Sequence, residues 1–161
     1  MKTELDIADR MILSQLQHDA KCSLEQLADA CGLSTASVQR RLKRLRDNKV
    51  IEREVAVIDP SAVGQHMTFI VMVELEREKL DEMDAFRRTV QSEPQVQQCY
   101  YVTGEADFTL ICIAQDMSDF EALTNRLFFE NSNVRRFRTS VVMKRTKVGL
   151  AVPTMHQENR P

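Results

Sequence analysis

The sequence predicts an α+β protein in which an N-terminal three-helix, winged helix-turn-helix domain precedes a ferredoxin-like βαββαβ domain. Apolar residues follow a helical period over the first sixty residues, and a turn of about three residues separates the second and third helices. From Thr68 the pattern changes to short β-branched segments that alternate with two helical ones. Asp59-Pro60 and Gly64 interrupt both patterns. We therefore expect domains at 1–60 and 68–153, a connector at 61–67 and a flexible tail at 154–161.

Capping residues mark where the N-terminal helices begin and end. Asp6 is well placed to cap the first helix. Ser23 and Gln26 form a capping-box pattern at the start of the second. Gly32 follows the last apolar residue of that helix and can take the left-handed conformation that ends it. Because Ser34 can cap a third helix, the spacing is that of a helix-turn-helix.

The third helix has the most informative charge pattern of the chain. Between Thr35 and Lys49 there are six cations and one anion, although the whole chain has a net charge of -2. Val38, Leu42 and Leu45 form a narrow apolar stripe, as packing against two other helices requires. The outward side contains Ala36, Arg40, Lys43 and Asp47. A basic helix alone is more often solvated surface than a binding site, but a capped preceding helix and a short turn favour insertion into the major groove of DNA.

The remaining helices and strands are predicted from the period of the apolar residues and from the residues that interrupt it. Residues 50–59 are expected to be extended, either as a small wing or as the lead into a connecting strand. The second domain should contain strands at 68–76, 96–102, 108–114 and 134–144, with helices at 79–93 and around 120–128. Pro94 ends the first of these helices. The order β-α-β-β-α-β is the ferredoxin-like arrangement.

Composition limits the class of protein. A chain of 161 residues that is 43% hydrophobic can bury a core. It has no apolar run of about 18 residues and no signal-peptide pattern at its start, so we expect a cytoplasmic protein with no membrane contact. The cysteines lack Cys-x-x-Cys spacing and lie in apolar segments, which favours reduced, buried thiols over disulfides or metal ligands. They are Cys22, Cys31, Cys99 and Cys112.

Several short motifs follow one another along about 150 residues of the chain. They are Leu5-Asp6-x-x-Asp9 with Ile12-Leu13, Leu33-Ser34 followed by Val38-x-x-Arg41-Leu42-x-x-Leu45, Val50-Ile51, Val102-Thr103-Gly104-Glu105-x-Asp107-Phe108, Ser140-x-Val142-Met143-Lys144 and Pro153. In order and spacing they resemble the Lrp/AsnC family of bacterial and archaeal transcriptional regulators. The resemblance implies a DNA-binding N-terminal domain, a C-terminal domain that dimerises and senses small molecules, often amino acids, and frequently a ring of four dimers.

Two departures from the family pattern concern local structure. Relatives often have a glycine before the Val-Ile pair, where this chain has Asn48-Lys49, and we expect Asn48 to take the left-handed cap instead. Ala106, Phe108 and Thr109 differ around the sensing loop, which affects the identity of the effector and not the fold.

Position along the third helix predicts what each polar residue does on double-stranded DNA. N-terminal residues of a recognition helix lie at base edges and later residues lie nearer the backbone. Ser37, Gln39 and Arg40 are therefore predicted to read bases, and Lys43 and Arg44 to meet phosphates. The full predicted DNA-binding set is Ser34, Thr35, Ala36, Ser37, Gln39, Arg40, Arg41, Lys43 and Arg44.

Residues at the start of this helix and at the edge of its apolar stripe have other predicted roles. Ser34 and Thr35 lie at its start, where free backbone N–H groups favour a phosphate oxygen. Arg41 and Arg46 lie near the boundary of the apolar stripe and can cover the edge of the core. For Arg41, an ion pair with an acid of the first helix and a contact with DNA are equally good predictions.

The second domain is predicted to dimerise through its open sheet and to bind an effector where dimers meet. Gly104 lets a ligand approach the backbone, and Asp107 can pair with an α-amino group. Both are also ordinary hairpin residues, so a plain turn is the alternative. The resemblance adds further contacts, and the predicted effector set is Tyr101, Thr103, Gly104, Glu105, Asp107, Thr139 and Ser140.

Two other classes of function compete with a regulator. Some relatives of the family are haem-precursor decarboxylases, so a ligand-binding or enzymatic ferredoxin-like protein with a vestigial helix-turn-helix is the main alternative. His18, His66 and His156 all lie off the predicted sheet, and no phosphate loop, carboxylate pair or metal-ligand cluster is present, so we expect no catalytic residue, cofactor or metal. A protein-binding adaptor is the third class, and weak salt dependence would distinguish it from a DNA-binding protein.

Overall fold

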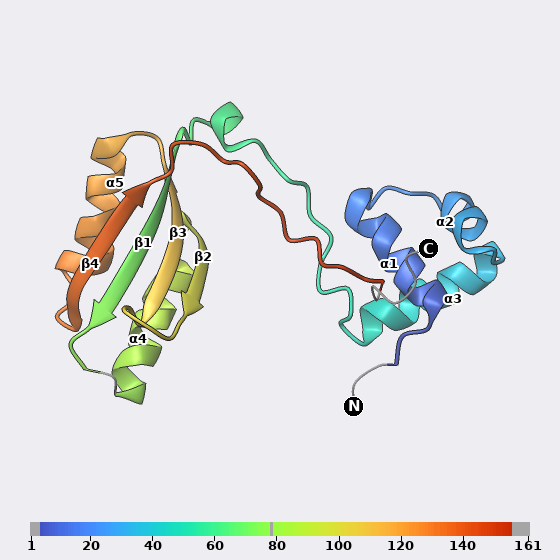
Figure 1. The fold of residues 1–161 in the computed structure, drawn as a ribbon, viewed down its shortest axis with the longest axis horizontal. Helices are drawn as coiled ribbons and strands as arrows, with labels where there is room; N and C mark the ends of the chain where they lie inside the picture. Colours follow the sequence, from blue (N-terminus) through green and yellow to red (C-terminus); the bar gives the residue numbers. More distant parts are fainter. Residues whose placement is uncertain (1–3, 78, 156–161) are drawn as a thin grey trace. The chain divides into compact units, whose positions relative to one another are not determined.

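The computed structural model describes residues 4–77 and 79–155 and consists of two compact units, each with its own apolar core. The first unit contains the chain up to Val57 together with the segment that begins at Val148, and the second unit is Ile58–Lys147. Figure 1 shows three helices in the first unit and a four-stranded sheet with helices in the second. The predicted α+β fold class is therefore confirmed.

The first unit is a bundle of three short helices, α1 (Ile7–His18), α2 (Leu24–Cys31) and α3 (Thr35–Asp47). Each helix begins at its predicted cap: Asp6, Ser23 and Ser34 accept hydrogen bonds from the backbone N–H groups of Asp9, Gln26 and Ser37. Gly32 has φ of 64° and ends α2 in the left-handed conformation. The predicted apolar stripe of α3 lies in a core that consists of Ile12, Leu27, Ala28, Val38, Leu42 and Leu45.

The end of α3 differs from the expectation at one residue. Asn48 was expected to take the left-handed conformation, but its φ is -85° and Lys49 has φ of 54° instead. The backbone N–H groups of Val50 and Ile51 reach back to the carbonyl of Leu45, at 2.9 and 3.2 Å. That return requires the left-handed residue immediately before Val50, which is why Lys49 adopts it.

The segment after α3 is extended but forms no strand. Among the described residues of the first unit there is no β-strand, so the part 52–59 is the lead into a connection and not a wing hairpin. Val55 and Val57 are exposed on it. Asp59 then caps the 3₁₀ turn η1 (Pro60–Val63), which Gly64 ends with φ of 82°.

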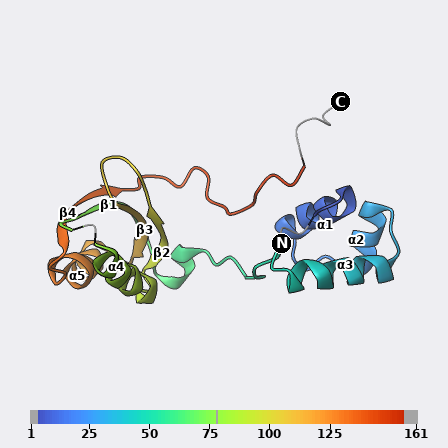
Figure 2. The ribbon, with the colours of Figure 1, turned by 90° about the horizontal axis from the view of Figure 1, so that it is seen from below.

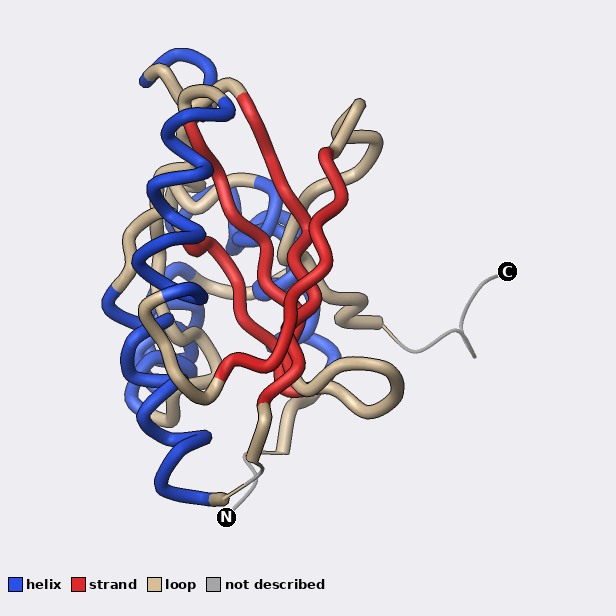
Figure 3. Tube along the Cα trace, turned by 90° about the vertical axis from the view of Figure 1, so that its left-hand side faces the viewer, coloured by secondary structure: helices blue, strands red, loops and turns tan. Residues whose placement is uncertain are grey.

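The second unit has the predicted βαββαβ order. Its elements are β1 (Met67–Leu75), α4 (Leu80–Ser92), β2 (Val96–Tyr101), β3 (Phe108–Ala114), α5 (Met117–Thr124) with a π-helical turn η2 (Asn125–Phe129), and β4 (Val134–Val141). The sheet is antiparallel in the order β2-β3-β1-β4, so β2 and β4 are its edges. Figures 2 and 3 show α4 and α5 against one face of the sheet, with the other face open.

The core of this unit lies between the sheet and its helices. Alternate residues of β1, namely Phe69, Val71 and Val73, are fully buried there. Phe69 stacks on Phe120 of α5 with ring centroids 3.7 Å apart. The last strand is shorter than its predicted span of 134–144 because the backbone N–H of residue 142, which bonds to the carbonyl of residue 68, makes the last contact along that edge.

Three expectations change in detail. Residues 148–153 were assigned to the second domain, but they group with the first unit. Of the predicted tail, Thr154 is held by a hydrogen bond from Arg10, and residues 156–161 lie outside the described part of the chain. The cysteines are free thiols as expected, but of the four only Cys112 is buried: Cys22 and Cys31 are half-buried, and Cys99 is exposed on the edge strand β2. Among the described residues, no helix is both long and apolar enough to cross a membrane.

Candidate DNA-binding surface and effector region

The outward face of α3 carries donors that have no partner among residues 4–77 and 79–155. Gln39, Arg40 and Lys43 are all exposed. Within the described part of the chain, none of their side chains forms a hydrogen bond or an ion pair. Their guanidinium, amide and ammonium groups are therefore available to a ligand outside the protein. Double-stranded DNA, which presents acceptors on bases and phosphates, suits all three.

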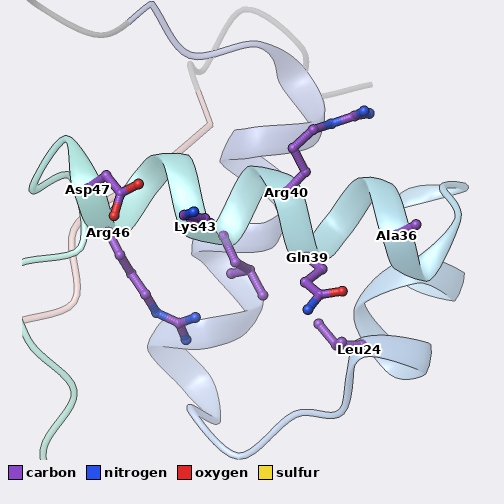
Figure 4. Close-up of a pocket in the computed structure, with 8 residues that line it drawn as sticks. Leu24, Ala36, Gln39, Arg40, Lys43, Arg46 and Asp47 are labelled. Atoms are coloured by element: carbon purple, nitrogen blue, oxygen red, sulfur yellow. The ribbon is translucent and has the colours of Figure 1, made fainter.

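A groove runs along one side of these residues. It has a volume of about 580 Å³ and is lined by Leu24, Ala36, Gln39, Arg40, Leu42, Lys43, Arg46 and Asp47. In Figure 4, Gln39 lies beside Leu24 at the start of α2, whereas Arg40 points to the other side of α3. The two predicted base-reading side chains of this turn therefore diverge from the helix, as they must in order to reach neighbouring base pairs.

Two other arginines of α3 are held by the first helix. The Arg41 guanidinium donates to Asp6 and Asp9, at 2.7 Å each. The side chain of Asp9 is 1% exposed, and Arg44 bonds to its second oxygen. These bonds to Asp9 and Asp6 raise the pKa of Arg41, in that order of importance. The ion pair predicted for Arg41 is therefore confirmed, and Arg44 has a structural partner that the sequence did not indicate.

The side chains of Arg41 and Arg44 differ in how much of their surface is exposed. The Arg41 side chain is 23% exposed, and both its oxygen partners lie on the first helix or its cap. The Arg44 side chain is 45% exposed, so part of its guanidinium still faces solvent. Arg46, predicted to lie at the edge of the core, donates to Glu54 in the extended segment at 2.7 Å. Of these three side chains, that of Arg41 is the least exposed, whereas those of Arg44 and Arg46 are about half exposed, at 45% and 49%.

The start of α3 is shaped by its cap. The Ser34 hydroxyl accepts from the Ser37 N–H at 3.3 Å, so this oxygen is committed to the helix. Thr35 and Ala36 are exposed, and Ser37 is half-buried. The backbone N–H groups of the first turn and the positive end of the helix dipole remain directed outward, which is the feature that favours a phosphate at this position.

The predicted effector loop joins β2 to β3. Figure 2 shows this loop on the open side of the sheet, away from α4 and α5. Thr103, Gly104 and Glu105 are exposed, and Gly104 has φ of 119°, a conformation that favours glycine. Ala106 is buried and anchors the loop. The exposed peptide groups at the tip can therefore be approached closely by a small ligand.

Asp107 already has a partner inside the sheet. Its Oδ2 accepts from the Leu75 N–H at 2.7 Å, at the point where the pairing of β1 with β4 shifts register. Its own N–H donates to the carbonyl of Val73. Within the described part of the chain, Oδ1 accepts no hydrogen bond. One oxygen therefore completes the sheet and the other is available to an ammonium group.

A network of charges connects the loop to the last strand. Glu105 accepts from Arg138 at 3.1 Å, and Arg138 also donates to Glu74 at 3.2 Å. Arg136 pairs with the other oxygen of Glu74 at 2.7 Å. These contacts, with that of Arg136 first, lower the pKa of Glu74. Arg138 was not identified from the sequence, because only the register of β4 on β1 places it beside the loop.

The structure does not bring all the predicted effector residues together. Tyr101 lies on the edge strand β2, where its ring is 5.4 Å from the Arg87 guanidinium on the helix side. Thr139 and Ser140 lie on the opposite edge strand β4. Three strand spacings of about 4.8 Å separate these edges. Within one protomer, Tyr101 therefore cannot share a small ligand with the two β4 residues.

Comparison with known proteins identifies both units. Residues 5–52 match the winged helix-turn-helix DNA-binding family, and residues 68–152 match the Lrp/AsnC ligand binding domain. An uncharacterised helix-turn-helix transcriptional regulator of Sinorhizobium fredii, y4tD, is 48% identical over 150 residues, which cover 93% of this chain and 89% of that protein. The leucine-responsive regulatory protein of Rhizobium meliloti is 30% identical over 147 residues, covering 91% and 94% of the two chains.

A solved structure supports the same assignment. The transcriptional regulator of Neisseria meningitidis, crystallised as its L-methionine complex, superposes with a TM-score of 0.87 at 27% identity, covering 93% of this chain and 97% of that one. The relatives are named as transcriptional regulators. The helix-turn-helix and the ligand-binding domain together make this protein a ligand-responsive, DNA-binding transcriptional regulator, and the chain belongs to the Lrp/AsnC family.

Proposed function

We propose that α3 reads DNA sequence through Ser37, Gln39 and Arg40, and holds the duplex through phosphate contacts from Lys43 and Arg44. The observation that carries this division is the set of free donors on α3, because Gln39, Arg40 and Lys43 have no partner among the described residues. Arg44 contributes the exposed part of a guanidinium that Asp9 already orients. Ser34, Thr35 and Ala36 allow a phosphate to approach the start of the helix.

Arg41 takes the structural part of its two predicted roles in this proposal. Its guanidinium lies between two carboxylates, and it is the less exposed of the two arginines that Asp9 binds. Its contribution to DNA binding is then indirect, because Asp9 cannot hold Arg44 in place unless the buried carboxylate is neutralised.

The oligomer follows from the open face of the sheet. Ile70 is 38% exposed at its centre, and Met72, Ile111 and Ile113 are half-buried beside it. An apolar sheet face with no helix over it is suited to a symmetric contact with a second copy, which also matches the two-fold symmetry of paired DNA half-sites. We take the homodimer as the basic form and a ring of four dimers, an octamer, as its assembly in the cytoplasm.

The effector is an amino acid bound between copies of the chain. Support comes from the loop tip at Gly104, from the free Oδ1 of Asp107 and from a solved relative that holds L-methionine. The distance between Tyr101 and the β4 residues Thr139 and Ser140 also favours a shared site, because only a second protomer can bring these positions together around one ligand. Glu105 controls the approach through its bond to Arg138.

Calorimetric titration of the full chain with each of the twenty amino acids tests this site. At least one amino acid should release or absorb heat with the wild-type protein. Asp107→Asn keeps an oxygen for the Leu75 N–H but removes the charge that pairs with an ammonium group, so we expect affinity to fall by about tenfold or more. Asp84→Asn, on the exposed surface of α4, is the matched control and should bind as the wild type does. Equal affinity for Asp107→Asn and the wild type would remove Asp107 from the site.

DNA binding distinguishes this function from an adaptor. A protein held to DNA by several cations loses affinity steeply with salt, with a slope of about -0.9 in log-log units for each phosphate neutralised. Titrations against the DNA upstream of its own gene at two salt concentrations should therefore show a strong decrease. A nearly flat response would favour a protein-binding adaptor. We also propose that the chain has no catalytic activity, since the relatives that match it over most of its length are named as transcriptional regulators.

A further inference from the structure

The C-terminal segment makes a specific contact with α1 that the DNA-binding and effector functions do not explain. The Gln17 side chain donates to the carbonyl of Val152 at 3.0 Å and accepts from the N–H of the same residue at 2.7 Å. The Arg10 guanidinium donates to the carbonyl of Thr154 at 2.9 Å. Both partners lie on α1, and all three contacts are made to the backbone of the segment.

The geometry of these contacts is that of peptide recognition. A primary amide that both donates to and accepts from one residue imitates the pairing of a neighbouring β-strand. Because Gln17 is near the end of α1 and Arg10 near its start, the segment runs antiparallel to the helix. Backbone contacts of this type depend on an extended chain and not on particular side chains in it.

The chain between the sheet and this contact is otherwise free. After residue 142, the residues from 143 to 151 form no hydrogen bond or ion pair within the described part of the protein. Met143 and Leu150 on this stretch are 93% and 74% exposed. Among the described residues, the contacts with α1 are therefore the hydrogen bonds that hold the segment in place after residue 142.

We propose that residues 148–155 are a strap that binds α1 of the same chain and gives the DNA-binding unit a second connection to the sheet domain. The first connection is the segment 52–59, which is extended and contains no strand. A unit held by two connections has less freedom of orientation than a unit held by one, so pairs of recognition helices are presented to DNA with a smaller loss of entropy. The stretch of chain that leads to the strap begins where β4 ends, directly after Ser140 and Val141.

That starting point gives the strap a regulatory role, and this step rests on the proposed function. Thr139 and Ser140 are predicted effector residues on β4, and only eleven residues separate Ser140 from Val152. A displacement of β4 on effector binding would move the start of this path, which is independent of the segment 52–59. Docking of the strap is measured without effector, so its result does not depend on whether the amino-acid site exists.

Hydrogen exchange at residue resolution measures the docking. In the wild-type full chain, the amide of Val152 should exchange more slowly than the amides of residues 145–150, for which the described part of the chain provides no partner. Gln17→Ala should raise the exchange rate of the Val152 amide by about fivefold or more, corresponding to one lost hydrogen bond. Gln15→Ala is the matched control, because this glutamine is exposed on the same helix and its side chain has no partner among the described residues. Exchange of Val152 at the rate of a free peptide in the wild type would overturn the proposal.

Cross-linking decides whether the strap binds its own chain. Gln17→Cys and Val152→Cys are introduced after the native cysteines are replaced by serine. Because the native contact spans a full glutamine side chain, the two cysteines are too far apart for a direct disulfide, and a short bis-methanethiosulfonate reagent is used to link them. A product with the mass of one chain supports the proposal. A product that contains two chains would overturn it, because the strap would then belong to a second copy.

The restraint itself is measured with spin labels on Asp29→Cys of α2 and Arg88→Cys of α4, with one labelled chain diluted among unlabelled ones. The wild-type strap should give a narrower distribution of distances than the double variant Arg10→Ala/Gln17→Ala. Equal widths would show that the strap does not limit the DNA-binding unit, and would overturn its role as a second connection.

Discussion

At the scale of single residues, Asp9 holds two of the arginines of α3. Its carboxylate is buried and binds Arg41 and Arg44, whereas Arg40, one position before Arg41, faces solvent with no partner in the described chain. A buried anion needs paired cations to offset the cost of removing it from water. The basic face of α3 therefore contains two kinds of cation, and their chemistry cannot be distinguished from residue type alone.

Replacing Asp9 by asparagine should destabilise the first unit by about 2–4 kcal/mol. The amide can occupy the same space, but it leaves two guanidinium groups without their counter-ion and loses charge-assisted hydrogen bonds. Urea unfolding followed by circular dichroism measures the change. Asp84→Asn breaks an exposed pair with Arg87 and should change the free energy of unfolding by no more than about 0.5 kcal/mol. A similar small effect for Asp9→Asn would mean that the buried pair contributes little.

Lys49 offers a stabilising change at the end of α3. A non-glycine residue with φ of 54° is strained, whereas glycine adopts this conformation without a steric cost. Lys49→Gly should therefore stabilise the first unit by about 0.5–1 kcal/mol, after the greater entropy of glycine in the unfolded chain is included. Thermal unfolding measures this change. Asn48→Gly, at a position with negative φ, is the control and should have the opposite sign.

Local signals predicted much of this residue-scale detail, and long-range contacts did not. The caps at Asp6, Ser23 and Ser34 depend on hydrogen bonds that span three residues, so the sequence pattern contains them. The bond from Arg44 to Asp9 spans 35 residues and depends on how the helices pack. The position of Arg41 at the edge of the apolar stripe indicated an acid of the first helix as its partner, but no signal in the sequence indicated that Arg44 shares this acid.

At the scale of elements, α3 presents different polar side chains along its length. Its N-terminal half presents Gln39 and Arg40, and its C-terminal half presents Lys43 beside the anchored Arg44. The period of the apolar residues predicted this orientation, since Val38, Leu42 and Leu45 are all buried. Because this apolar side packs into the core, the polar side of the helix faces solvent.

Arg40→Ala and Lys43→Ala should weaken DNA binding in different ways. A lost contact to a base edge costs about 1–3 kcal/mol and relaxes the preference at one position, while a lost phosphate contact weakens all sequences alike and lowers the salt slope by about one. Titrations against a small library of operator variants at two salt concentrations separate these effects. Equal losses on every sequence for both variants would show that Arg40 does not read bases.

The order of the strands was predictable, but the neighbours across the sheet were not. A βαββαβ pattern implies the observed topology, because crossover connections must be right-handed and short. It does not specify register, and register is what places Arg138 opposite Met72 and close to the loop residue Glu105. The strand order itself places Tyr101 and Ser140 on opposite edges, although the family pattern had grouped them as one site.

At the scale of the whole molecule, both units carry carboxylates whose ionised form is stabilised by folding. The pKa of Asp6 is lowered by the Asp9 N–H and then by Arg41, and the pKa of Glu74 is lowered first by Arg136. A carboxyl whose pKa is lower in the folded state contributes stability above its unfolded pKa, and that stability is lost as pH falls through the folded value.

The free energy of unfolding should therefore decrease in both units as pH falls below about 4, near the usual carboxyl range. Glu74→Gln removes one of these groups, so its sheet domain should lose less stability over the acid range than the wild type does. Unfolding measured at several pH values decides this. Parallel curves for the variant and the wild type would mean that Glu74 does not contribute to the acid response.

The open face of the sheet is the surface that we propose for the contact between two chains of the dimer. Ile70 lies at the centre of that face on β1, and Leu80 of α4 is 78% exposed on an element of the helix-covered side. Ile70→Glu should abolish the dimer, because a carboxylate would be buried against apolar residues of a second copy at a cost of several kcal/mol. Leu80→Glu should leave the dimer unchanged. Analytical ultracentrifugation measures both, and a dimer that survives Ile70→Glu would assign the contact to another surface.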